Sequence, residues 1–293
     1  MLSAVATSSL QRKVRERVGR CRLYVSCRVI DVHDPLEGVS AVGTITTGVD
    51  RTRVAIEFAS IIDAAVDAVR HRGDHPAVYL YGSVATGQAR VGTSDVDMLT
   101  VDLPAEAAEA IADDLSTRFA AVCRGVEIAT AHTDDFVGDT DEAYGGRVFL
   151  HHYCVHLVGP HHDHSVNDFP ADKRAARGFN GDIAQHVRRW RNALDAGDDP
   201  ASVARLLARK TLLAVAGLVS IHDHTWTTDR QLAERRWTEI DPAGTDGVAD
   251  LLTWIDGHVA PSVDGVVDAL NETVDPIVTQ FANMIGLWPD HTP

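Results

Sequence analysis

The chain has 293 residues, of which 45% are hydrophobic, 24% charged and 6% aromatic. This composition is typical of globular proteins and excludes a disordered chain, a collagen-like repeat and a disulfide scaffold. No window approaches ~18 uninterrupted apolar residues, so no membrane-spanning helix is expected. No apolar segment typical of a secretory signal follows the basic residues near the start. The four cysteines form no C-x-x-C pair, which predicts free thiols in a cytoplasmic protein.

The charge balance narrows the expected partners. Lys and Arg number 27 against 42 Asp and Glu, a formal net charge of −15. Such a surface repels phosphate backbones, so a nucleic-acid partner is not expected unless a local basic patch compensates. The charge favours cationic or neutral small ligands, and solubility alone explains it equally well. The sequence does not predict the oligomeric state.

The first half of the chain predicts a small α/β unit. Residues 1–50 could form a small strand, a flexible arm or an over-long gene start, and the sequence does not decide between them. Asp50 is a plausible N-cap for a helix over residues 51–72. The elements expected next are a buried strand at 77–83, a strand at 96–103, a helix at 104–122 and a strand at 125–132. This order places helices around a short sheet.

The second half predicts helices. The apolar segment 148–160 is buried but of ambiguous type, and no strand pattern returns after Pro160. Candidate helices cover residues 172–196, 201–222, 228–240, 247–258 and 262–286. The expected fold class is therefore α/β (α+β). An arm at 1–50 precedes a small mixed-sheet domain at 51–160, and an all-α helical bundle follows at 161–293.

Residues 80–101, LYGSVATGQARVGTSDVDMLTV, carry the clearest chemical pattern. Gly82 allows a tight turn whose backbone N–H groups can face an anion, and the Ser83 hydroxyl adds a donor for a phosphate oxygen. Asp95 and Asp97 alternate with Val96, which places both carboxylates on one face of a strand. Two carboxylates so placed can bind hard divalent cations such as Mg²⁺, together with substrate phosphates.

A third carboxylate, Glu127, is expected in the centre of the strand at 125–132. Val126 and Ile128 would point to the opposite face, which leaves Glu127 on a polar face. A glutamate inside a strand is costly to bury unless it is paired or metal-bound. Glu127 could complete a metal site or act as a base, and a plain surface residue is the alternative.

These motifs resemble the DNA polymerase β-like nucleotidyltransferase superfamily, and within it the aminoglycoside adenylyltransferases of the streptomycin and spectinomycin type. YGSVATGQARVGTSDVDMLTV and GVEIATA carry the superfamily likeness. LVGP, ARKTLLAVAG and TTDRQLAERRW look like the helical half of that subfamily. The resemblance covers about residues 52–285 and implies that 51–160 is the nucleotidyltransferase domain and 161–293 the substrate-binding domain.

The resemblance also implies residue roles. The nucleotide phosphates would be held by Gly82, Ser83, Lys210 and Arg230. Mg²⁺ would be bound by Asp95 and Asp97, with Glu127 as third ligand or as base for the accepting hydroxyl. Many relatives read Gly-Ser-x-Ala-Arg-Gly, whereas this chain has Thr86 before Gly87. A cation near the triphosphate is therefore missing or is supplied by Arg90.

The implied activity is transfer of AMP from ATP to a hydroxyl of a small cationic acceptor such as an aminoglycoside, with release of pyrophosphate. This activity would confer antibiotic resistance, with ATP as co-substrate and Mg²⁺ as cofactor. Two alternatives stay open: a protein or tRNA acceptor, as in toxin–antitoxin systems, and a nucleotide-binding module without catalysis. The acidic charge disfavours tRNA but not a protein acceptor.

A histidine cluster raises a zinc site as a further hypothesis. The cluster consists of His151, His152, His156, His161, His162 and His164. No zinc motif spacing accompanies it, so a loop with partly buried histidines is the expected reading. Some of these side chains could line the substrate cleft.

Overall fold

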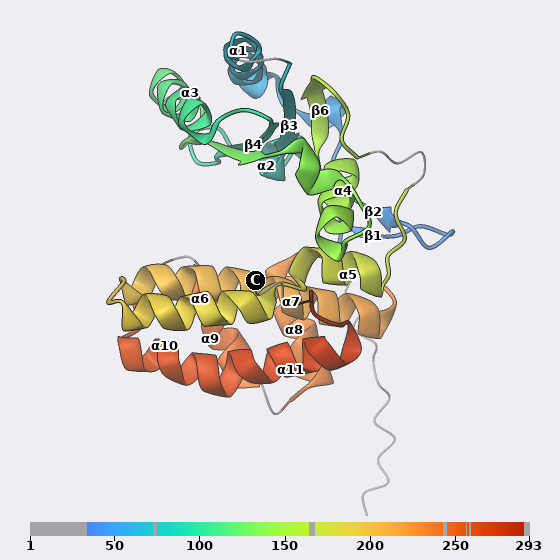
Figure 1. Cartoon of the computed structure of the whole chain (residues 1–293), viewed down its shortest axis with the longest axis vertical. Helices are drawn as coiled ribbons and strands as arrows, with labels where there is room; N and C mark the ends of the chain where they lie inside the picture. Colours follow the sequence, from blue (N-terminus) through green and yellow to red (C-terminus); the bar gives the residue numbers. More distant parts are fainter. Residues whose placement is uncertain are drawn as a thin grey trace, which may run out of the picture. The chain divides into compact units, whose positions relative to one another are not determined.

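The computed structural model describes residues 34–72, 75–163, 168–242, 245–255, 257 and 259–289 (Figure 1). Most of the expected N-terminal arm, and His164 of the histidine cluster, lie outside these residues. The fold is mixed α/β: a small four-stranded mixed sheet with its helices, followed by a helical region. In the described part of the chain, no helix is long and apolar enough to cross a membrane.

The four strands of the sheet lie in the order β5-β4-β3-β6. The strands are β3 (Ala77–Tyr81), β4 (Val96–Val101), β5 (Val126–Ala131) and β6 (Val155–Val158). β4 and β5 run parallel, whereas β3 is antiparallel to both β4 and β6. The three strands expected from the sequence are confirmed. The ambiguous segment resolves into the end of α4 (Asp141–Tyr153) and then β6, because Cys154 adopts an extended backbone that ends the helix.

The two faces of the sheet bury different side chains. Val96 and Met98 of β4 pack with α1 (Ala59–Arg70) and α3 (Ala105–Arg118) in one core. Leu99 and Val101 belong to a second cluster, which includes Leu150 of α4. Since side chains alternate along a strand, Asp97 shares the face of Leu99 and Val101. The site described below therefore lies on the α4 side of the sheet.

The expected helix over 51–72 begins later than predicted. Asp50 caps as expected, since its carboxylate accepts from the backbone N–H of Thr52, but it caps only a 3₁₀ turn, η1 (Arg51–Arg53). Val54 and Ala55 then adopt extended backbones and interrupt the helix. A second 3₁₀ turn, η2 (Ile56–Phe58), leads into α1.

The helical region packs around α7. Its helices are α5 (Lys173–Asn180), α6 (Ile183–Asp195), α7 (Pro200–Asp223), α8 (Arg230–Ile240), α9 (Thr245–Ile255), α10 (Val263–Ala269) and α11 (Asp275–Met284). α7 contacts α5, α6, α8, α9 and α11, and its buried face supplies much of the largest core. Its central position follows from the small and apolar residues on its buried face between Val203 and Val219.

Two helices predicted as continuous are interrupted. The 172–196 helix divides at Gly181, where a Cβ would overlap the Trp288 ring, and the Trp288 indole N–H donates to the Arg177 carbonyl (2.8 Å). The 262–286 helix contains a π turn, η4 (Leu270–Val274), between α10 and α11. Pro276 at the start of α11 has no N–H for the regular helical bond, which accounts for the irregular turn before it.

Residues 34–46 pack on segments of the helical region. They include the short strands β1 (Gly38–Val39) and β2 (Ile45–Thr46), which pair with each other. The Ile45 N–H donates to the Phe169 carbonyl (2.9 Å), and the Ile45 side chain belongs to the largest core. Part of the stretch left undecided by the sequence is thus a folded hairpin.

α4 is joined closely to α5. A Cβ at Gly145 would overlap the backbone of Gly178, and a Cβ at Gly178 would overlap Gly145, so both positions require glycine. An ion pair flanks this crossing: Arg177 Nε donates to an Asp141 carboxylate oxygen (2.6 Å). The sheet-covering helix and the first helix of the helical region are therefore fixed side by side.

Candidate active site

The Gly82-Ser83 turn lies against the Asp97 carboxylate. β3 ends at Tyr81 and runs directly into α2 (Gly82–Ala85), a single helical turn. Gly82 has φ +72°, and a Cβ there would overlap the Asp97 side chain. The Ser83 carbonyl accepts the N–H groups of Gln88 and Ala89, which closes the loop after the turn. Glycine at position 82 therefore allows the backbone to approach a carboxylate.

Asp97 and Glu127 are direct neighbours across the sheet. The parallel register of β4 and β5 pairs Asp97 with Glu127, and the antiparallel register of β3 and β4 pairs Asp97 with Tyr81. Since adjacent strands are about 4.8 Å apart, the two carboxylates leave the same face of the sheet side by side. Asp97 is half-buried, whereas Glu127 is exposed on the edge strand.

The electrostatic environment of Asp97 is unfavourable for its charge. Burial, together with the negative charges of Glu127 and Asp95, raises the pKa of Asp97 to about 6. Burial, followed by the charge of Asp97, raises the pKa of Tyr81 to about 12. Arg124 only partly offsets the acidic charge. Such a carboxylate cluster favours a bound cation.

Asp95 lies just before β4, which begins at Val96 as expected. Both Asp95 carboxylate oxygens accept from Arg124, one of them from Nε at 2.9 Å. The sequence analysis did not identify Arg124. The available signal was a basic residue directly before the strand that carries Glu127.

The donor set around Asp97 fits Mg²⁺. Asp97 and Glu127 present hard carboxylate oxygens on one face, and Mg²⁺ is commonly bound by one or two carboxylates plus water and phosphate oxygens. Within the described ranges, no three His, Cys, Asp or Glu side chains are already assembled as a metal site. Both Asp95 oxygens already accept from Arg124, which would compete with a metal ion for them.

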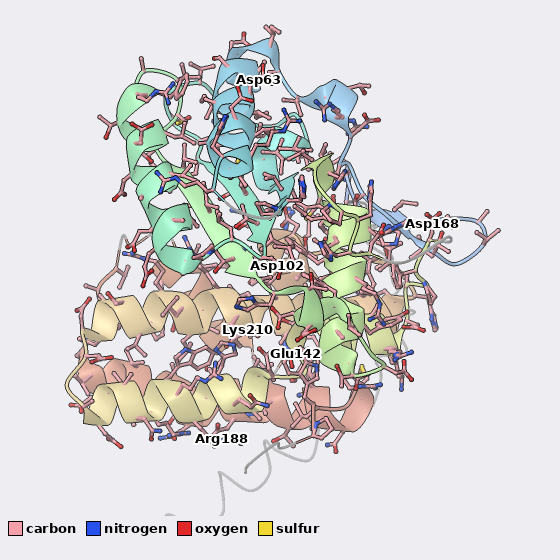
Figure 2. The ribbon with its side chains drawn as sticks, turned by 45° about the horizontal axis from the view of Figure 1, so that its top comes forward. Asp63, Asp102, Glu142, Asp168, Arg188 and Lys210 are labelled. Atoms are coloured by element: carbon pink, nitrogen blue, oxygen red, sulfur yellow. The ribbon has the colours of Figure 1, made fainter. Side chains whose placement is uncertain are left out.

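Lys210 and Arg230 make their contacts within the helical region. Lys210, labelled in Figure 2, extends from α7, and its Nζ lies 2.6 Å from an Asp182 carboxylate oxygen and 2.9 Å from the Phe179 carbonyl. Arg230 Nε donates to the Arg209 carbonyl (3.2 Å), and burial lowers the pKa of its guanidinium. The contacts that unite Gly82, Asp95, Asp97 and Glu127 do not include these two residues. Their assignment to nucleotide phosphates stays a prediction.

Thr86, which stands where many relatives of the resembled family carry arginine, caps the turn. Its hydroxyl lies 3.3 Å from the Gly82 carbonyl and 3.2 Å from the Ser83 carbonyl. This side chain reinforces the loop without supplying a positive charge. Arg90, the alternative cation, is exposed a few residues further on.

The histidine cluster makes local contacts. His151 lies between two carboxylates, with Nδ1 3.0 Å from Asp163 and Nε2 3.1 Å from Asp168. His152 Nε2 accepts from the Phe169 N–H (3.0 Å), and burial lowers the pKa of His152 to about 4. A neutral His152 is required for that acceptor role. These contacts tie the end of α4 to the segment that precedes α5.

Cys123 and Cys154 are free and buried, and Cys21 and Cys27 lie outside the described residues. Burial raises the pKa of the Cys154 thiol well above its usual value, so it is not a reactive nucleophile.

Comparison of the chain with protein-family models found no match. Comparison with curated proteins also found no match.

Proposed function

We propose that the chain is a Mg²⁺-dependent nucleotidyltransferase that moves AMP from ATP to a hydroxyl of a small acceptor. The observation that carries the proposal is the pairing of Asp97 with Glu127 beside the Gly82 turn. A phosphate-binding turn, a metal-binding carboxylate and a second carboxylate then meet at one edge of a sheet. The motif resemblance supports the same assignment, and the net charge of −15 favours a cationic acceptor such as an aminoglycoside.

The proposed chemistry requires binding and alignment more than covalent participation. The backbone N–H groups at Gly82 and Ser83 and the Ser83 hydroxyl would bind phosphate oxygens of ATP. Asp97, with Glu127 and with Asp95, for which Arg124 competes, would hold Mg²⁺. The chemistry that Mg²⁺ supplies when bound is neutralisation of charge on the phosphate oxygens.

In the proposed transfer step, one bond to the α-phosphorus of ATP forms as another breaks. The acceptor oxygen forms a bond to the α-phosphorus of ATP while the bond from that phosphorus to the bridging oxygen breaks. Pyrophosphate leaves with the electron pair. Glu127, exposed beside Asp97, would accept the proton of the attacking hydroxyl. The alternative role for Glu127 is a further metal ligand, with the proton passing to solvent.

The test is release of pyrophosphate from ATP and Mg²⁺ by the full chain, with streptomycin, spectinomycin, kanamycin or no acceptor. We expect release with one of these acceptors and its loss in Asp97→Asn. Asp63→Asn, an exposed acid on α1 (Figure 2), is the matched control and should keep full activity. Unchanged activity in Asp97→Asn would overturn the mechanism. ATP binding without release on the whole panel would favour a protein or RNA acceptor, or a nucleotide-binding module.

A further inference from the structure

A small cavity outside the carboxylate cluster is walled by aromatic rings. It measures about 180 Å³ and lies among α4, α5, α7 and the segment that follows α7. Phe149, Tyr153, Phe179 and Trp226 line it. An apolar cavity of roughly 150 Å³ accepts a benzene molecule, so this slightly larger volume fits a small, flat ring system.

The rings that form the wall are fixed by one another. Phe149 stacks on Tyr153 (6.1 Å between centroids, 10° between planes), and Phe179 meets Tyr153 edge-on at 5.6 Å. The Trp226 indole N–H donates to the Tyr153 hydroxyl (2.7 Å). The polar atoms of Trp226 and Tyr153 are thus already bonded, which leaves their ring faces as preformed apolar contacts.

Asn180 gives the cavity one polar group without a partner. The side chain lines the cavity and is only 5% exposed. Its Nδ2 donates to the Leu213 carbonyl (3.2 Å), whereas its Oδ1 is buried and has no hydrogen-bond partner in the described structure. A buried acceptor left unpaired is unfavourable, so a ligand donor would bind there once the Asn180 amide turns its covered Oδ1 towards the cavity.

One pair of rings links the wall of the cavity to the candidate active site. Phe149 packs edge-on against Tyr81 at 5.3 Å, and Tyr81 is the register partner of Asp97. Among the described residues that line the cavity, none is Asp, Glu, Lys or Arg. A charged group that entered would lose hydration without a partner, so the walls select an uncharged group.

We propose that this cavity binds an uncharged ring bearing one N–H or O–H donor, with the ring packed against Phe149, Phe179 and Trp226 and the donor bonded to Asn180 Oδ1. The source of the ring rests on the proposed function: it is either the base of the nucleotide or a ring of the acceptor. Both sources present the same chemistry to the cavity. Any cationic groups of the acceptor would remain outside it.

The test uses two probes of nearly equal shape, 4-fluorophenol and 4-fluorotoluene, titrated against the full chain and followed by ¹⁹F NMR. Only the first carries a donor. Asn180→Leu keeps the volume and removes the acceptor, so it should shift the preference between the probes by about tenfold towards 4-fluorotoluene. Thr211→Val is the matched control, because Thr211 is also buried on α7 with an unpartnered hydroxyl but does not line the cavity. It should leave the preference unchanged.

Gly217→Ala provides a second variant that is expected to fold. Gly217 lies inside α7 and lines the cavity, and a Cβ there would meet its neighbours at 3.5–3.9 Å, which is ordinary contact. Alanine also favours the helix. Because the new methyl group fills part of the cavity, both probes should bind several-fold more weakly. The proposal is overturned if neither probe binds the wild-type chain, or if Asn180→Leu leaves the preference between probes unchanged.

Adenosine added to the probe complex distinguishes the two sources. Displacement of 4-fluorophenol identifies the ring as the nucleotide base, whereas retention of the probe assigns the cavity to the acceptor. Because probe binding needs no turnover, the two proposals fail separately. Probe binding that depends on Asn180 without any release of pyrophosphate would overturn the proposed function alone.

Discussion

The pKa values of acidic side chains shift in opposite directions in the helical region and at the end of the sheet that carries Asp97. In the helical region, hydrogen bonds from Arg236 hold the pKa of Asp223 below its usual value. Burial acts to raise the pKa of Asp182, but the His186 hydrogen bond and the Lys210 charge lower it overall. At the sheet edge, burial and two neighbouring carboxylates raise the pKa of Asp97 to about 6.

This difference separates acids that stabilise the fold from acids that cost stability. A paired carboxylate is more favourable in the folded than in the unfolded chain, and a carboxylate buried among other carboxylates is less favourable. Among the described carboxylates only Asp97 and Glu37 have a clearly raised pKa, and such costly groups are typical of functional sites. The contrast therefore supports the proposed role of Asp97, and variants can test each side of it.

The largest effect is expected at Asp97. Asp97→Asn should lower pyrophosphate release on the order of 10³-fold, since it removes the proposed metal ligand and its charge. The same change should raise the free energy of unfolding by about 1 kcal/mol at pH 8, because it removes a carboxylate whose ionisation opposes folding. Urea unfolding and initial rates on the same preparation measure both. If Asp97→Asn lost both activity and stability, the carboxylate of Asp97 would not be a group that costs stability.

The opposite result is expected for the Asp182 pair. Asp182→Ala leaves Lys210, which is mostly buried, without its carboxylate, and should lower the free energy of unfolding by about 3 kcal/mol. Urea unfolding at pH 7.5 measures the loss. Asp114→Ala on α3 is the matched control: its pair with Arg118 is more than half exposed on both sides. That variant should change stability by less than about 0.5 kcal/mol, and equal losses in both would refute the argument.

Glu37, in the segment 34–46 that packs on the helical region, tests whether that packing tolerates an unfavourable acid. Its carboxylate accepts from the N–H and the hydroxyl of Thr228, yet burial raises its pKa to about 7. The folded chain therefore holds the proton more tightly than the unfolded chain. This contribution to stability is complete below pH 4.5 and is lost as the pH rises to 7.

Glu37→Gln should remove that pH dependence. It keeps an acceptor for Thr228 and removes the charge, so at pH 8 it should be about 2 kcal/mol more stable than the wild type, with little difference at pH 4.5. Chemical unfolding at both values measures this. Glu142→Gln, an exposed change on α4 (Figure 2), should stay within about 0.5 kcal/mol at both. If Glu37→Gln differed from the wild type by the same free energy of unfolding at both pH values, the charge of Glu37 would not be the cause of the difference.

The sequence predicted the sheet side of this contrast better than the helical side. Local alternation around Val96 and Val126 was enough to predict β4 and β5 and to put Asp97 and Glu127 on polar positions. Alternation could not supply the register that makes them neighbours, nor show that Asp95 binds Arg124. Those features depend on pairing between segments about 30 residues apart.

In the helical region, the spacing of apolar residues predicted the helices but neither their interruptions nor the contacts between them. The break at Gly181 depends on Trp288, which is more than 100 residues away in the chain. The Lys210 motif suggested a phosphate ligand, and only the packing of α7 on α5 and α6 brings Asp182 to it. The aromatic cavity likewise combines Phe149 with Trp226, which no local pattern joins.

The smallest predicted effect sharpens the contrast most directly, because an added cation should do for Asp97 what Lys210 does for Asp182. Mg²⁺ at about five times its dissociation constant should stabilise the wild type by about 1 kcal/mol, a rise in Tm of about 2–4 °C, with EDTA reversing it. Asp97→Asn should show no rise, whereas Asp182→Ala, although less stable, should show the full one. An equal rise in Tm in the wild type and both variants would show that Mg²⁺ binds elsewhere and that Asp97 is not part of the metal site.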